Sequence, residues 1–135
     1  MNKHSYLRAY LAGIAVPTMF MLIVLIFFIV ARFVYNVPVA IERLLVFPMA
    51  VVPNLWGIWN VLHLRFDSRH RLPLGIHGAA LVLLLVPVGL LLARALNIWI
   101  VTPASIITVA PVGLIIYYLA WKHIVGFFNR LLEVG

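Results

Sequence analysis

The sequence predicts an all-α fold: a bundle of four transmembrane helices, arranged as two antiparallel hairpins, with the N-terminus and the C-terminus in the cytoplasm. The first observation is composition, since 66% of the 135 residues are hydrophobic and 10% are charged, against about 45–50% and about 25% in soluble domains. The second is a set of four apolar runs, 11–34, 44–64, 75–94 and 104–121, each close to the roughly 20 residues that cross a bilayer. We therefore expect residues 1–135 to form a single integral membrane domain covered by lipid.

The third observation is the placement of positive charge. Ten Lys and Arg residues against three acidic residues give a formal net charge of +7. They stand between or beside the apolar runs, without the basic stripe of a nucleic-acid interface, so we expect the lipid bilayer and its anionic phospholipid head groups as partners, and no nucleic acid. Seven of the ten belong to the terminal segments and the middle loop: Lys3, Arg8, Arg65, Arg69, Arg71, Lys122 and Arg130. The positive-inside rule places these segments in the cytoplasm, and the membrane is predicted to be a bacterial-type inner (plasma) membrane.

The first apolar run predicts a retained helix. It is longer than the roughly 7–15 apolar residues of a cleavable signal, and nothing in it suggests chemistry. Pro17 falls in the opening turns, where a missing backbone N–H costs least. The connection 35–43 is too short for a domain, so the first two helices are predicted to form a hairpin.

The second run is the most polar of the four. Pro53 removes a backbone donor and obstructs the carbonyl of Met49, so a kink is predicted there. Four residues of this run, Pro53, Asn54, Trp56 and Asn60, are candidates for a ligand or ion path along a broken helix. The alternative, which we favour for the two amides, is hydrogen bonding to neighbouring helices.

The last two runs predict close helix contacts and an amphipathic end. Gly75, Ala79, Gly89 and Ala93 give two small-xxx-small spacings, which let helices approach closely in lipid. After 121, the chain is expected to lie along the membrane surface as an amphipathic segment. Because four such helices enclose little interior, we expect a homo-oligomer or a subunit of a larger membrane complex.

Three histidines, His63, His77 and His123, are predicted at helix ends on the cytoplasmic face. Imidazoles on facing helices at one depth can bind haem or a transition metal. The alternative is that they lie among lipid head groups, and no HExxH motif favours a metal. The neighbouring aromatic residues of the fourth run could contact a flat ligand such as a quinone, although packing is the stronger interpretation.

Five arginines are candidates for binding anionic lipid head groups. Arg32 and Arg94 end the first and third runs, where such side chains usually extend to the interface, and Glu42 could pair with either. The other three belong to the middle loop: Arg65, Arg69 and Arg71.

The sequence shows no catalytic constellation. There is no cysteine and no acidic residue within the runs, and we find no glycine-rich phosphate loop, no metal motif and no nucleophile with a plausible base. The predicted function is therefore non-enzymatic: an oligomeric interaction subunit, or a small pore or carrier. The alternative is a membrane redox or ligand-binding subunit that uses the histidines with haem, a metal or a quinone.

Overall fold

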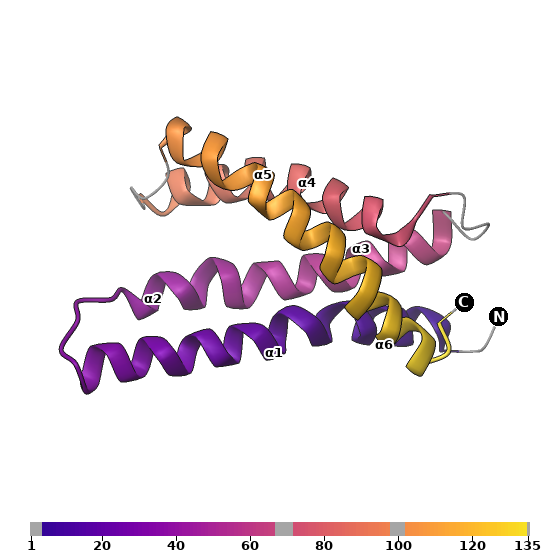
Figure 1. Ribbon diagram of the computed structural model, residues 1–135, viewed down its shortest axis with the longest axis horizontal. Helices are drawn as coiled ribbons and strands as arrows, with labels where there is room; N and C mark the ends of the chain where they lie inside the picture. The colour runs from indigo at the N-terminus through magenta and orange to yellow at the C-terminus, as the bar shows by residue number, and fades with distance from the viewer. Residues whose placement is uncertain (1–3, 67–71, 98–101, 135) are drawn as a thin grey trace.

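The computed structural model describes residues 4–66, 72–97 and 102–134, and over these residues the protein consists of four long helical segments (Figure 1). The first is α1, Ser5–Phe33. The second joins α2, Ile41–Leu44, the π-helix η1, Leu45–Val51, and α3, Val52–Phe66. The third is α4, Leu74–Ala95. The fourth joins α5, Pro103–Leu119, the π-helix η2, Ala120–Val125, and α6, Gly126–Leu131.

The four segments lie as two packed pairs. α1 packs against α3, and α4 packs against α5, while α6 crosses back over α1 (Figure 1). Both chain ends, the end of α3 and the start of α4 gather at one end of the molecule, which we call the terminal end. The prediction of an all-α protein with four helices is confirmed; the direction in which each helix crosses a membrane stays a prediction.

Three helices of the described residues are long and apolar enough to cross a membrane: Ser5–Phe33, Leu74–Ala95 and Ala104–Leu131. The expected fourth span is not among them, because η1 interrupts its α-helical geometry and the α3 part has only 15 residues. The structure has a wider π turn before Pro53, which contains Met49, the residue whose carbonyl the proline leaves without a helical donor. The kink predicted at Pro53 stays a prediction.

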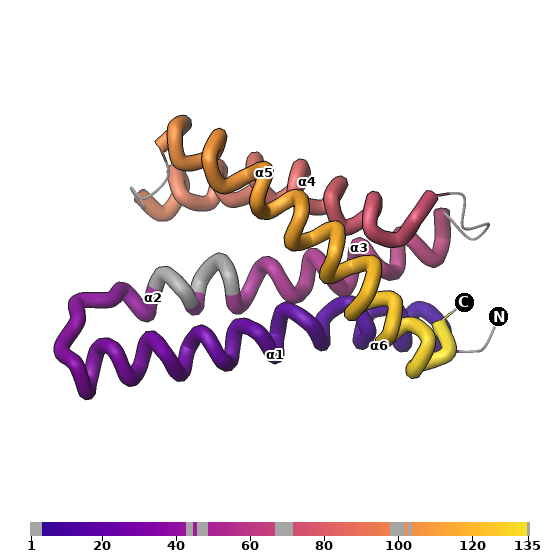
Figure 2. The backbone as a smooth tube through the Cα atoms, viewed as in Figure 1, coloured from indigo at the N-terminus to yellow at the C-terminus, as the bar shows by residue number. Residues whose placement is uncertain are grey.

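The fourth segment corrects one expectation. Residues beyond 121 do not separate into a surface helix; η2 and α6 continue α5 as one rod to Leu131 (Figure 2). The charged side chains of this stretch made it resemble a surface segment, but two of them line a pocket described below.

Small residues set the crossing of α1 and α3. The buried face of α1 consists of Ser5, Ala9, Ala12, Gly13 and Pro17. A Cβ built on Gly13 would lie 2.6 Å from the Trp56 carbonyl oxygen and 2.9 Å from the Gly57 Cα. The two backbones are therefore in contact, which only glycine permits.

A second close crossing joins α4 to the fourth segment. A Cβ on Gly78 would lie 2.5 Å from the Tyr117 carbonyl oxygen, and one on Gly75 would lie 2.7 Å from the Tyr118 ring. Gly75 thus packs against a side-chain ring and the backbone contact is made by Gly78, while close backbone approach at the four predicted small residues stays a prediction. The hydrophobic core lies beside it: Val52, Trp56, Leu81, Leu85, Trp121 and Val125.

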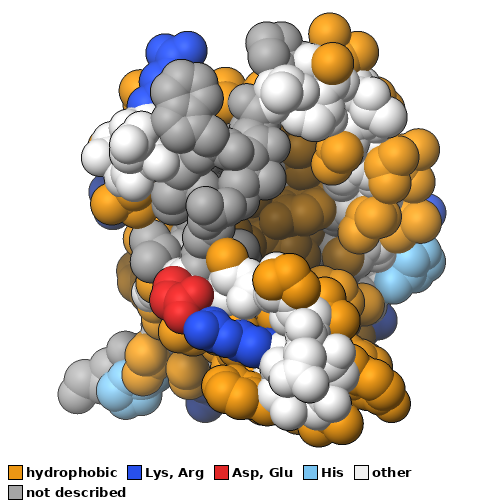
Figure 3. Space-filling model, turned by 90° about the vertical axis from the view of Figure 1, so that its left-hand side faces the viewer, with side chains coloured by type: hydrophobic (Ala, Val, Ile, Leu, Met, Phe, Trp, Pro, Cys, Tyr) orange, Lys and Arg blue, Asp and Glu red, His pale blue; other side chains and the backbone are white. Residues whose placement is uncertain are grey.

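The end opposite the terminal end is open. Seen from there, the molecule is hollowed between its two helix pairs, and the side chains deep in the hollow are hydrophobic (Figure 3). Large apolar side chains of both pairs are also exposed on the surface, for example Phe27 at 68% and Ile107 at 75%. Lipid or a partner helix must cover them.

Candidate functional site

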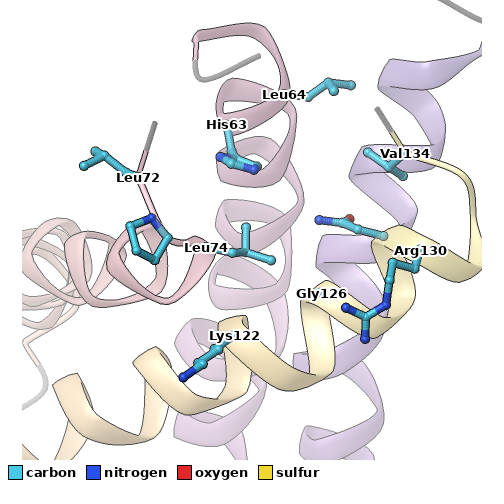
Figure 4. A pocket seen from close by; sticks show the side chains of 10 residues that line it. His63, Leu64, Leu72, Leu74, Lys122, Gly126, Arg130 and Val134 are labelled. Carbon is cyan, nitrogen blue, oxygen red and sulfur yellow. The ribbon is translucent and has the colours of Figure 1, made fainter. Parts of the chain in front are cut away.

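A pocket of about 490 Å³ opens at the terminal end, between the end of α3, the start of α4 and the η2–α6 stretch (Figure 4). Six of its ten lining residues are apolar or small, and the other four are two cations, a histidine and an amide. The lining residues are His63, Leu64, Leu72, Pro73, Leu74, Lys122, Gly126, Asn129, Arg130 and Val134.

The charge of this pocket is positive. Lys122, Gly126 and Arg130 are spaced four residues apart. Residues at this spacing are neighbours on a helix surface, so all three lie along one side of the fourth segment. None of the lining residues within 4–66, 72–97 and 102–134 is acidic. The α4 helix also begins here without an acidic residue in its first turn, so its dipole adds partial positive charge.

The carboxylates of the described residues are engaged elsewhere. Glu133 lies 3.4 Å from Arg8 and Glu42 lies 2.9 Å from Arg32, measured between the charged atoms. Lys122 stacks over the Tyr118 ring at 5.8 Å from its centroid. The two pocket cations therefore meet no carboxylate among the described residues, which favours an anionic ligand.

Two of the three predicted histidines come together, and one of them, His63, lines the pocket. The rings of His63 and His77 meet edge to face with centroids 4.3 Å apart, and Trp59 Nε1 donates a hydrogen bond to the His77 carbonyl at 2.9 Å. His123 is exposed in η2. No group of three or more potential metal-ligating side chains occurs within the described ranges, so a metal or haem at the pair stays a prediction.

Asn129 connects the pocket to the centre of the bundle. Its Nδ2 donates to Asn60 Oδ1 at 3.2 Å, and Asn60 Nδ2 donates to Asn129 Oδ1 at 2.7 Å. Asn60 Nδ2 also donates to the Ala9 carbonyl at 2.7 Å, and the Asn60 side chain is fully buried. The interhelical hydrogen bonding favoured for Asn60 is observed, and it joins α1, α3 and α6.

The other three residues of the predicted path lie in different surroundings. Pro53 and Trp56 are buried, and the Trp56 ring meets Tyr117 at 4.9 Å between centroids. Asn54 is exposed; its Nδ2 donates to the Ala50 carbonyl at 2.7 Å and its Oδ1 accepts from the Tyr10 hydroxyl. A path through these residues remains untested.

The predicted head-group arginines are spread over the molecule. Arg32 pairs with Glu42, one of the two pairings considered from the sequence. Arg65 is exposed at the end of α3 near the Phe66 ring, and Arg94 is exposed in the last turn of α4. Arg69 and Arg71 lie outside the described residues. Binding of lipid by these arginines stays a prediction.

Comparison with protein-family models, curated proteins and solved structures finds no match to this chain. The site must therefore be interpreted from its own geometry.

Sequence reasoning did not identify Lys122, Asn129 and Arg130 as site residues. The available signal was local: Lys122, Gly126 and Arg130 at spacings of four, with an asparagine beside the second cation. On its own that pattern predicts an amphipathic surface segment, because the sequence does not show which residues of α3 and α4 lie opposite it.

Proposed function

We propose that the protein is a non-enzymatic ligand-binding component of a membrane, and that its terminal pocket holds an anionic group. The observation that carries this proposal is that Lys122 and Arg130 both line a pocket to which the described part of the chain contributes no acidic residue. Ammonium and guanidinium groups form short, charge-assisted hydrogen bonds to phosphate and carboxylate oxygens. The pocket volume, about 490 Å³, lies within the roughly 300–1,000 Å³ of small-molecule sites.

A soluble anion tests this proposal directly. Glycerol 3-phosphate, added to protein in a neutral detergent, should raise the midpoint of thermal unfolding, because a ligand that binds only the folded state stabilises it. Glycerol at the same concentration should not. The double variant Lys122→Gln/Arg130→Gln should lose the effect.

The matched control is Arg65→Gln/Arg94→Gln, which removes two exposed arginines from positions that do not line the pocket. It should keep the response of the wild type. No protection of the wild-type protein by either glycerol 3-phosphate or dioctanoyl phosphatidylglycerol, or equal loss in both double variants, would overturn the proposal.

A second candidate function is an interaction subunit that assembles with further copies of the chain, or a small pore or carrier formed by them. The observation that favours it is Asn54, whose polar amide is exposed on α3 beside Tyr10. An amide facing lipid is costly, whereas a neighbouring helix can supply further hydrogen-bond partners.

This second candidate predicts that Asn54→Leu alters the oligomeric state in nanodiscs, or flux across vesicles, while membrane insertion stays intact. Ile58→Asn makes the opposite change, since it adds an amide instead of removing one, at an exposed position one turn further along α3. An Asn54→Leu variant that matches the wild type in both assays would remove the candidate.

A further inference from the structure

We infer that the ligand of the terminal pocket is an anionic phospholipid, with its phosphate held by Lys122 and Arg130 and its glycerol-ester region against the apolar wall. This inference rests on the proposed function, because it names the ligand of the same site. The remaining question is why a lipid fits better than a free phosphate.

The composition of the pocket wall favours a lipid. Leu64, Leu72, Leu74 and Val134 face the same pocket as the two cations. A small, fully hydrated anion has no apolar surface to bury against these side chains. The methylene and ester groups that follow a phosphate in a lipid do, and their burial stabilises the complex. A ligand with a charged end and an apolar end matches both halves.

The position of the pocket at the helix ends also favours a lipid. The pocket is formed where α4 begins at Leu74 and where the candidate span Ala104–Leu131 ends. Helix ends of this kind lie at the boundary between hydrocarbon and head groups. Phospholipid phosphates are concentrated at this level, so a lipid can enter from the side without leaving the bilayer.

The pocket also offers several hydrogen-bond donors to one phosphate. Eight residues of α-helix rise about 12 Å. The Lys122 ammonium lies over the Tyr118 ring in the structure, so this long side chain must change rotamer to meet Arg130 at one phosphate above Gly126. A Cβ on Gly126 would already lie 3.4 Å from Leu74 Cδ2, so a larger side chain there would occupy the space of the ligand. Asn129 uses one N–H on Asn60, and its second N–H can donate to a phosphate or ester oxygen.

The experiment uses the full chain in neutral detergent and compares three probes by native mass spectrometry: dioctanoyl phosphatidylglycerol, dioctanoyl phosphatidylcholine and glycerol 3-phosphate. We expect the anionic lipid to bind most tightly. The Lys122→Gln/Arg130→Gln variant should lose about 30-fold in affinity for it, as two basic groups near a membrane surface predict. The Arg65→Gln/Arg94→Gln variant removes two head-group candidates that lie outside the pocket, so its loss of affinity should be clearly smaller.

Each other outcome has a definite meaning. Equal affinity for the anionic lipid and glycerol 3-phosphate would overturn the lipid inference and leave the proposed function standing. Absence of binding by both, or equal weakening in the two double variants, would overturn both. If Lys122→Gln/Arg130→Gln fails to fold, Gly126→Leu replaces it: this variant keeps both charges, and unchanged lipid binding by the folded variant would also refute the inference.

Discussion

The crossing of α1 and α3 gives the sharpest stability prediction, the effect of Gly13→Ala. The new Cβ would lie 2.6 Å from the Trp56 carbonyl oxygen, 2.9 Å from the Gly57 Cα and 3.0 Å from the Asn60 Cβ. Favourable contacts between carbon atoms lie at about 3.5–4.0 Å. Two of the three neighbours are backbone atoms, so the helices must separate by several tenths of an ångström or more at this point.

The magnitude follows from three contributions. Overpacking of this kind costs about 1–3 kcal/mol. Separation also lengthens the 2.7 Å bond from Asn60 to the Ala9 carbonyl, and interhelical hydrogen bonds in membranes contribute about 0.6 kcal/mol on average. Alanine returns about 0.5–1 kcal/mol of helix stability relative to glycine. We expect a net loss of about 1–3 kcal/mol.

The control is the same substitution where space is available. A Cβ on Gly113 would lie 3.9 Å from Val82 Cγ1, so Gly113→Ala should be neutral or slightly stabilising. Both variants can be compared in mixed micelles titrated with dodecyl sulfate, followed by the fluorescence of the four tryptophans. If Gly13→Ala unfolds at the wild-type midpoint or shifts in the same direction as Gly113→Ala, the backbone contact is not as close as described.

Three further predictions concern individual side chains. Asn60→Leu should destabilise the protein by about 2 kcal/mol, from three bonds of about 0.6 kcal/mol each; additivity with Asn129→Leu in a double-mutant cycle would show that the amides are not coupled. The Glu42 carboxyl has its pKa lowered from the ordinary 4.5 by its own backbone amide and then by Arg32. Its contribution to stability is therefore complete above about pH 4.5 and is lost as the pH falls through the lower folded pKa. Glu42→Gln should abolish that acid step, and an identical acid profile in the variant would contradict the assignment. Purified protein should show neither a haem absorption band nor stoichiometric metal; a band that disappears in His63→Ala would instead favour a redox subunit.

The sequence was sufficient to predict the helices and one of their contacts. Long apolar runs at span length can only be helices in lipid, where every backbone group needs an internal partner. The same reasoning explains Asn60, because a buried amide must find hydrogen bonds. The irregular turn before Pro53 follows from the missing N–H.

The buried face of α1 could not be identified in the same way. In water, polarity distinguishes the exposed side of a helix, but a helix in lipid is apolar on every side. Only the small residues Ser5, Ala9 and Gly13, four apart, indicated which side packs against α3. The terminal pocket was harder still, because its walls come from three segments that are distant in the chain and whose register depends on the glycine crossings.

The hydrogen bonds of Asn60 also order events during synthesis. Asn129 follows Asn60 by 69 residues, so the first helix pair enters the bilayer before this amide partner exists. Within that pair Asn60 Nδ2 can donate to the Ala9 carbonyl, but until the ribosome has delivered α6, the second N–H and the Oδ1 of Asn60 lack their Asn129 partner, which hydrocarbon cannot replace. Arrival of the last helix removes that penalty, which makes completion of the chain the step that commits the bundle to its final packing.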